Sequence, residues 1–253
     1  MTKIKMLVVL WLGALVLWGA PVHADQELIV SAAASLTNAF PEIGKSFEKR
    51  HPGTKVIFNF AASGPLLQQI AQGAPVDVFA SADQKTMNQA QEKGLIAPAS
   101  RKNFVSNTLV LIVPEKSGLS LAALKDLASA EVKRVALGNP DTVPVGRYTR
   151  EALTQAGLWE TLTPKFIYGE SVRQVLDYVS RGEVDAGFVF ATDAAIAKGK
   201  VKTVTAVQGH QPIVYPVALV AASPKQPLAQ SFLDSVVSPE AQEIFQRYGF
   251  GKP

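Results

Sequence analysis

Short apolar runs rich in Val, Ile, Ala and Phe alternate with helical patterns along most of this chain. This alternation indicates α/β architecture, because a strand buried on both faces needs helices to cover it. The sequence predicts strands at 27–34, 55–62, 76–81, 107–113, 133–137, 165–168, 185–190, 201–207 and 213–222. It predicts helices at 38–50, 65–72, 84–93, 121–129, 147–156, 172–182, 227–236 and 239–248.

Residues 1–24 form a separate segment. Two lysines near the start precede an apolar run, and Val22-His-Ala24 provides a small-residue cleavage site. This pattern is typical of a secretory signal peptide and is too short to favour a permanent anchor. Removal of Lys3 and Lys5 lowers the formal net charge from +4 to +2. The remaining basic residues are scattered, so we expect no nucleic-acid partner.

The sequence contains no cysteine. Disulfides, thiolate catalysis and Cys-ligated metals are therefore excluded, as is a lipid-bearing cysteine. An exported protein without such an anchor stays near the cell most simply if an outer membrane confines it. We therefore predict a periplasmic location.

The segment after the signal is longer than a typical single domain, yet no Pro/Gly/Ser-rich linker divides it. Two long apolar stretches, 107–114 and 213–222, are candidates for crossings between two lobes. We predict one lobe from 25–106 with 219–253 and a second from 107–218. Such lobes form a cleft that can close on a ligand by a hinge motion. A single large sheet remains an alternative.

Ser35 and Ser63 each lie where a predicted strand ends and a helical pattern begins. A helix start carries unpaired backbone N–H groups and a partial positive charge, which suit an anion. Small neighbours allow the backbone to approach a ligand closely. The two serines therefore suggest a pocket for a small oxyanion, although each could simply cap its helix.

Two further helix starts offer backbone donors. A Pro/Gly-rich turn at 138–146 places the Val145 N–H at the entrance of a helix. Ser171 and Gln174 have capping-box spacing, which uses their own N–H groups and leaves that of Val172 free. An ordinary connection between strand and helix is the alternative for both segments.

Taken together, these segments resemble the periplasmic molybdate-binding proteins of ABC importers along nearly the whole chain after the signal. The resemblance is carried by Ala-Ala-Ala-Ser-Leu-Thr-Asn-Ala-Phe at 32–40, Phe-Ala-Ala-Ser-Gly at 60–64 and Val-Asp-Val-Phe-Ala-Ser-Ala-Asp at 76–83. It continues with Gly-Asn-Pro at 138–140, Val-Pro-Val-Gly-Arg-Tyr at 143–148, Glu-Ala-Leu at 151–153 and Gly-Glu-Ser-Val-Arg at 169–173. Gly-Phe-Val-Phe-Ala-Thr-Asp at 187–193 and the tail at 240–250 complete it.

The resemblance implies a type II periplasmic-binding-protein fold, with two α/β lobes joined by crossing strands. It implies a monomer that captures molybdate, and also tungstate, and delivers it to a membrane permease. It implies no enzymatic activity, no cofactor and no metal coordinated by side chains. The oxyanion is then held by Ser35 and Ser63 from the first lobe and by the Val145 and Val172 N–H groups from the second. Neutral dipoles can stabilise a desolvated dianion, and a pocket with donors alone discriminates against protonated phosphate.

One position departs from the family. Where the family commonly has tyrosine, this chain has Phe190, which cannot donate a hydrogen bond. We expect Phe190 to form a wall of the pocket, at some cost in affinity. This departure leaves sulfate or another tetrahedral oxyanion open as the ligand.

A serine hydrolase is a rival from another class. His51 and His210, the two histidines outside the signal, lie in turn-like sequences that predict exposed residues rather than catalytic bases. We expect Asp77 to serve a strand end and Asp83 to cap the next helix. Arg147 and Arg173 are expected to be ordinary solvated arginines, with added positive potential at the mouth of the cleft as the alternative.

Overall fold

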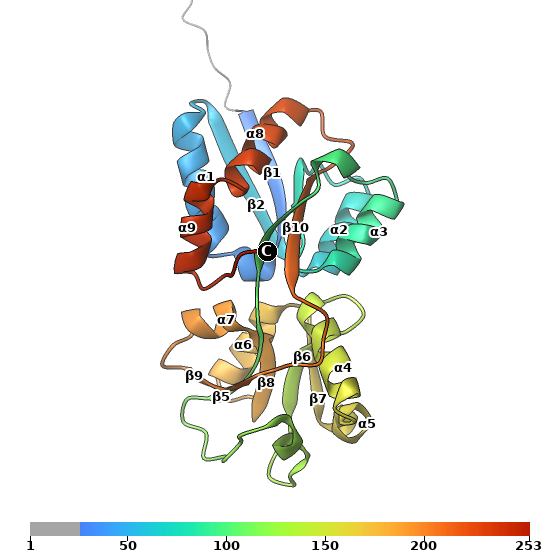
Figure 1. Cartoon of the computed structure of the whole chain (residues 1–253), viewed down its shortest axis with the longest axis vertical. Coiled ribbons are helices and arrows are strands. Elements are labelled where there is room, and N and C mark those ends of the chain that lie inside the picture. Colours follow the sequence, from blue (N-terminus) through green and yellow to red (C-terminus); the bar gives the residue numbers. More distant parts are fainter. Residues whose placement is uncertain (1–25) are drawn as a thin grey trace, which may run out of the picture.

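Two five-stranded sheets organise residues 26–253, the part of the chain that the computed structural model describes (Figure 1). The predicted signal at 1–24 lies outside these residues. Strand order is β2-β1-β3-β10-β4 in the first sheet and β7-β6-β8-β5-β9 in the second. The prediction of two α/β lobes is confirmed, and the alternative of one large sheet is wrong.

The strands of the two lobes agree with most of the predicted apolar runs. The first sheet contains β1 (Gln26–Ala33), β2 (Thr54–Ala61), β3 (Val78–Ala80), β4 (Lys102–Ser106) and β10 (Val214–Leu219). The second contains β5 (Leu109–Pro114), β6 (Val135–Gly138), β7 (Phe166–Gly169), β8 (Ala186–Phe190) and β9 (Val201–Ala206). The sequence did not predict β4 as a separate strand.

Helices cover both sheets (Figure 1). The first lobe has α1 (Ala39–Arg50), α2 (Ser63–Ala71), α3 (Gln84–Glu92), α8 (Gln226–Val236) and α9 (Pro239–Arg247). The second has α4 (Pro144–Gln155), α5 (Trp159–Leu162), α6 (Val172–Ser180) and α7 (Ala191–Ile196). The helix predicted at 121–129 is wrong, since only a 3₁₀ turn forms there, at Leu124–Ala128. In residues 26–253 no helix has the length and hydropathy needed to cross a bilayer.

The strand ends in each sheet fix where a ligand can approach. β1 pairs in parallel with β2 and β3, and β6 pairs in parallel with β7 and β8. The registers bring Ala33 beside Ala61 in one sheet and Gly138 beside Gly169 in the other. In open sheets of this kind, ligands bind outside the carboxyl ends of the parallel strands. Both sets of carboxyl ends lie at the junction between the lobes (Figure 1).

The chain crosses between the lobes twice. The first crossing is at residues 107–108, between β4 and β5, and the second is at 207–213, between β9 and β10. Each crossing leads into a strand that runs antiparallel to its neighbours in the new sheet. Because β10 pairs with β3 and β4, the chain has returned to the first sheet by Val214, earlier than the expected boundary after 218.

Helix α4 lies very close to its strand because Gly146 has no side chain. A Cβ added at Gly146 would lie 1.9 Å from the Gly138 carbonyl oxygen of β6. Glycine is therefore required for the approach that places the start of α4 at the carboxyl end of β6. Gly146 therefore helps to position the start of α4, whose backbone faces the other lobe.

Candidate functional site

A small cavity lies between the lobes, and all five candidate residues line it. Its free volume of about 10 Å³ is close to the space that the centre of a single water molecule needs. The first lobe contributes the loops after β1, β2 and β3, and the second contributes the starts of α4 and α6 and the end of β8. The lining residues are Ala33, Ala34, Ser35, Ala62, Ser63, Ala82, Val143, Pro144, Val145, Val172 and Phe190.

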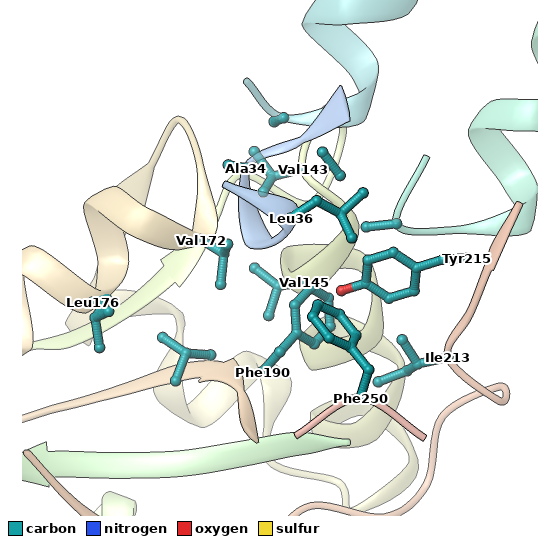
Figure 2. Packing of buried hydrophobic residues seen from close by; sticks show 14 of the residues in the cluster. Ala34, Leu36, Val143, Val145, Val172, Leu176, Phe190, Ile213, Tyr215 and Phe250 are labelled. Carbon is teal, nitrogen blue, oxygen red and sulfur yellow. The ribbon is translucent and has the colours of Figure 1, made fainter. Parts of the chain in front are cut away.

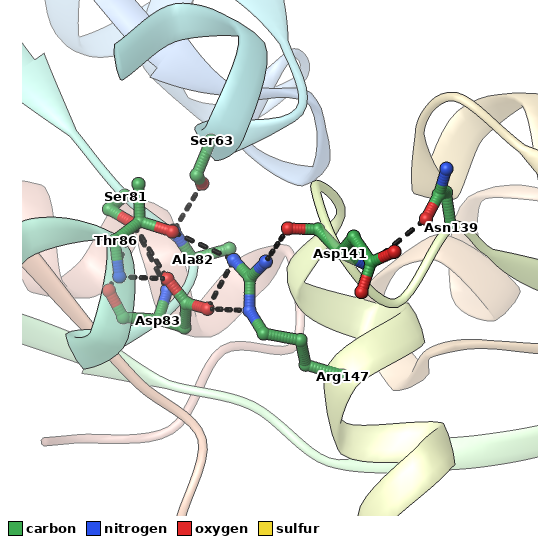
Figure 3. A network of polar contacts seen from close by, with 8 residues as sticks. All are labelled: Ser63, Ser81, Ala82, Asp83, Thr86, Asn139, Asp141 and Arg147. Carbon is green, nitrogen blue, oxygen red and sulfur yellow. Dashed lines mark hydrogen bonds and ion pairs between the residues drawn. The ribbon is translucent and has the colours of Figure 1, made fainter. Parts of the chain in front are cut away.

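Ser63 begins α2 directly after β2 and is fully buried. Its hydroxyl oxygen accepts a hydrogen bond of 3.0 Å from the Ala82 N–H, which follows β3 (Figure 3). A serine hydroxyl has one proton of its own. With its oxygen engaged by Ala82, Ser63 retains that proton for a ligand in the cavity.

Ser35 lies in a 3₁₀ turn, Ala34–Leu36, that follows β1. Its hydroxyl oxygen is 3.0 Å from the hydroxyl oxygen of Tyr215, on β10. The cap positions of the two helical segments are Ala33 and Ala62, and neither segment has a side-chain cap. The alternative that Ser35 and Ser63 only cap helices is therefore wrong.

The two valines supply backbone rather than side-chain donors. Val145 is the second residue of α4, and Val172 is the first residue of α6. N–H groups in the first turn of a helix have no intrahelical acceptor, and the helix dipole adds positive potential there. Ser171 caps α6 by accepting from the Gln174 N–H at 3.2 Å, as predicted. The Gln174 side chain accepts from the Glu170 N–H instead of that of Ser171.

Phe190 ends β8 and is buried. Its ring packs edge-on against Tyr148, with the centroids 6.4 Å apart. It also packs edge-on against Tyr215, with the centroids 5.9 Å apart (Figure 2). The side chain gives the cavity an apolar wall on the second lobe. It provides no polar atom to a ligand.

Charged side chains lie near the cavity but do not line it within the described part of the chain. Arg147 is buried and spans the cleft to Asp83 of the first lobe, with Nε 2.7 Å from Oδ2 (Figure 3). It also donates to the Thr86 hydroxyl at 2.7 Å and to the Asp141 carbonyl at 3.1 Å. The expectation of a solvated arginine is wrong for Arg147.

Arg173 makes a second connection across the cleft. Its Nη2 donates to the Ser35 carbonyl oxygen at 3.4 Å, and its Nε lies 2.6 Å from Oδ1 of the fully buried Asp193. Burial raises the pKa of Asp193 to about 6, although the Arg173 guanidinium lowers it. Arg173 therefore contacts both lobes, through one hydrogen bond to the Ser35 carbonyl oxygen and one ion pair with Asp193.

A third contact between the lobes involves backbone alone. The Gly64 N–H, in the first turn of α2, donates to the Thr142 carbonyl oxygen at 3.1 Å. A Cβ at Gly64 would lie 2.4 Å from that oxygen. The two lobes thus meet closely around the cavity, in a closed arrangement.

Within residues 26–253, the hydroxyls of Ser35 and Ser63 are hydrogen-bonded to Tyr215 and Ala82 and not to the histidine that a hydrolase would need. His51 stacks on Phe47, and His210 lies beside the carbonyl oxygens of Val207 and Gln211. Both histidines are half-buried, where exposure was expected. Asp83 caps α3 through the Thr86 N–H, as predicted. Asp77 accepts from the Ile29 N–H of β1.

Two residues near the site were missed by the sequence analysis. Asn107 lies at the first crossing and Tyr215 lies on β10, just after the second, and both take part in hydrogen bonds that reach Ser35. Tyr215 is 180 positions from Ser35 in the chain. Only the pairing of β10 within the first sheet brings the two together, and no local pattern signals that contact.

Comparisons with known proteins agree with this geometry. The family model for bacterial extracellular solute-binding proteins matches residues 28–251. The chain is 40% identical to the molybdate-binding protein ModA of Escherichia coli, over 90% of each chain. It is 36% identical to ModA of Haemophilus influenzae, over 90% of this chain and 91% of that one.

A solved structure shows the same likeness in three dimensions. The periplasmic molybdate-binding protein of Azotobacter vinelandii superimposes with a TM-score of 0.77 at 27% identity, covering 89% of this chain and 99% of that one. The predicted type II two-lobed fold is confirmed by the two sheets and this likeness. The chain belongs to the family of bacterial extracellular solute-binding proteins.

Proposed function

We propose that this protein captures molybdate in the cavity between its lobes and delivers it to the permease of an ABC importer. One observation carries the proposal: Ser35, Ser63, Val145, Val172 and Phe190 come from both lobes and line one small cavity. The ModA relatives, which match the chain over most of its length, bind molybdate by name. The proposal includes tungstate as a second ligand, a periplasmic location and a monomeric state.

The donor set supports a tetrahedral dianion in particular. Two hydroxyls and two first-turn N–H groups surround the cavity, and no charged side chain lines it in residues 26–253. Preorganised dipoles of this kind stabilise an anion without the reorganisation that a mobile counterion requires. The closed arrangement leaves a free volume of about 10 Å³ in the cavity, so little water can screen these interactions.

A thermal-shift panel tests the ligand. A ligand that binds only the native state stabilises it by about 2.7 kcal/mol at a hundredfold excess over its dissociation constant. We expect molybdate and tungstate to raise the unfolding temperature of the protein without its signal, and sulfate and phosphate to leave it unchanged. A shift with sulfate alone would support the alternative of a sulfate-binding protein of the same fold. Hydrolysis of ester substrates would support the serine hydrolase instead.

Serine variants test the site. Ser35→Ala and Ser63→Ala each remove a hydrogen bond to a charged ligand, a loss of about 1.5–3 kcal/mol, so molybdate affinity should fall at least tenfold by calorimetry. Ser31→Ala is the matched control, because Ser31 is buried on β1 and does not line the cavity. Normal binding by both site variants would contradict the proposed role of the two hydroxyls.

A further inference from the structure

The Ser35 hydroxyl belongs to a chain of hydrogen bonds that starts at the first crossing between the lobes. Asn107 lies at that crossing, and its Oδ1 accepts from the Thr108 N–H at 2.9 Å. This bond fixes the orientation of the amide, since a backbone N–H can only donate. The Asn107 Nδ2 therefore faces the Thr192 hydroxyl at 2.9 Å and the Tyr215 hydroxyl at 3.3 Å.

The direction of the next bond follows from the one before it. An amide nitrogen only donates, so the Tyr215 oxygen accepts from Asn107 and its proton needs another acceptor. Tyr215 is fully buried. Among the described residues, its one other hydrogen-bond partner is the Ser35 oxygen, at 3.0 Å. A buried phenol proton without an acceptor is costly, so Tyr215 donates to Ser35.

Ser35 is left with a free proton. Its oxygen accepts from Tyr215. Residues 26–253 provide no acceptor for the Ser35 proton, so this proton is available to a ligand in the cavity that Ser35 lines. Ser63 is in the same state, because its oxygen accepts from the Ala82 N–H. Both hydroxyls can therefore donate their protons to a ligand in the cavity.

The buried environment of Tyr215 keeps its hydroxyl protonated, so that Tyr215 remains the donor in the hydrogen bond to Ser35. Burial raises the pKa of its phenol well above the ordinary value, with Asp193 adding to the increase. The phenol thus keeps its proton at all pH values near neutrality. Figure 2 shows the ring extending from β10, with the hydroxyl on the side of Val145 and Phe190. Tyr215 itself does not line the cavity.

We propose that Tyr215 is a positioning residue that directs the Ser35 proton into the cavity and so selects fully deprotonated oxyanions. An anion that carries its own O–H needs an acceptor. Tyr215 occupies one of the two lone pairs of the Ser35 oxygen and leaves the Ser35 proton to the cavity, so Ser35 meets a ligand as a donor. Molybdate, which has no proton at neutral pH, fits this arrangement, whereas hydrogen phosphate does not. The proposal rests on the proposed function of oxyanion capture.

The test is a double-mutant cycle read by calorimetry with two probes. Wild type, Tyr215→Phe, Ser35→Ala and the double variant are titrated with molybdate, and with phosphate in competition against molybdate. Tyr215→Phe should lower molybdate affinity about three- to tenfold. It should also lower the ratio of molybdate to phosphate affinity, because the freed Ser35 oxygen can now accept from hydrogen phosphate. In the Ser35→Ala background, Tyr215→Phe should change neither affinity.

Tyr148→Phe is the matched control. Tyr148 is a buried tyrosine that packs against Phe190 and does not line the cavity, and its hydroxyl is not bonded to Ser35. We expect this variant to keep the wild-type ratio. Thermal unfolding without ligand checks that each variant folds. If Tyr215→Phe does not fold, Asn107→Ala replaces it, because it removes the donor that directs the Tyr215 proton, and the ratio should fall in the same direction.

Two outcomes would overturn this assignment. One is an unchanged ratio of molybdate to phosphate affinity in Tyr215→Phe, which includes the equal loss for both anions that a merely structural role predicts. The other is the same loss in the presence and absence of the Ser35 hydroxyl. If wild type binds no tetrahedral oxyanion, the proposed function fails as well. An unchanged ratio with normal wild-type binding overturns the role of Tyr215 alone.

Discussion

Phe190 is the residue at which this site differs from the pattern that the resemblance implies. Its ring is buried between Tyr148 and Tyr215 and lines the cavity with carbon atoms alone. The neighbouring Tyr215 does not replace the missing donor directly, because its hydroxyl is bonded to Ser35. On the proposed function, the second lobe therefore offers an oxyanion backbone N–H groups, those of Val145 and Val172.

Restoring a phenol at position 190 should strengthen binding. Phe190→Tyr adds a donor to a charged ligand, an interaction of about 1.5–3 kcal/mol, and we expect molybdate affinity by calorimetry to rise about tenfold. Phe166→Tyr is the control, since Phe166 lies on β7 of the same lobe and outside the cavity lining. Unchanged or weaker binding by Phe190→Tyr would show that this position has no direct role.

Residue patterns predicted four of the lining residues, Ser35, Ser63, Val145 and Val172, because each follows a strand end that local sequence makes recognisable. Phe190 came from the family resemblance alone. Ser35 and Ser63 come after apolar runs and small residues, and Val145 and Val172 come after glycine-containing turns. Arg147 was predicted wrongly, because its partner Asp83 is 64 positions away on the other lobe. A side chain that pairs across a cleft has no local signature.

At the scale of elements, the positions of the strand ends determine where the cavity forms. Three parallel strands in each sheet end at the cleft, and the helices that follow them begin there. The sequence predicted a strand from 107 and none at β4, because Lys-Asn-Phe-Val-Ser at 102–106 lacks a continuous apolar run. The short break at residues 107–108, where the chain changes lobe, has no Pro or Gly to mark it.

The start of α2 provides a test of the closed arrangement. Gly64→Ala would place a Cβ 2.4 Å from the Thr142 carbonyl oxygen of the other lobe. This backbone contact cannot relax by a rotamer change, so closure should cost about 1–3 kcal/mol. Within α2, alanine is a better helix former than glycine. We therefore expect weaker molybdate binding by calorimetry together with unchanged or higher thermal stability of the ligand-free protein.

Gly118→Ala is the matched control for this substitution, because a Cβ at Gly118 would meet nothing within 4 Å. It should leave both affinity and stability as in wild type. If Gly64→Ala bound molybdate with wild-type affinity, the approach of Gly64 to Thr142 would not belong to the ligand-bound form.

At the scale of the whole molecule, the two lobes are held together by a few polar contacts around the cavity. The Arg147–Asp83 ion pair is the one in which both side chains are almost fully buried. Opening the cleft would return both groups to water. Because desolvation offsets much of the attraction in such a pair, it contributes little net free energy to closure while both partners are present. The pair matters mainly because closure with one partner missing would bury the other charge without a countercharge.

Removing one partner should therefore oppose closure. Arg147→Met leaves Asp83 buried without a countercharge in the closed form, which costs roughly 3–5 kcal/mol. We expect molybdate affinity to fall at least a hundredfold, and small-angle scattering with ligand to show a more open molecule than wild type. Adding Asp83→Asn should recover part of the affinity, because asparagine keeps the cap of α3 without the buried charge.

Arg150→Met is the control on the same helix, since Arg150 pairs with Asp141 at the exposed surface, where ion pairs contribute little. Equal binding by Arg147→Met and Arg150→Met would mean that closure does not depend on the buried pair.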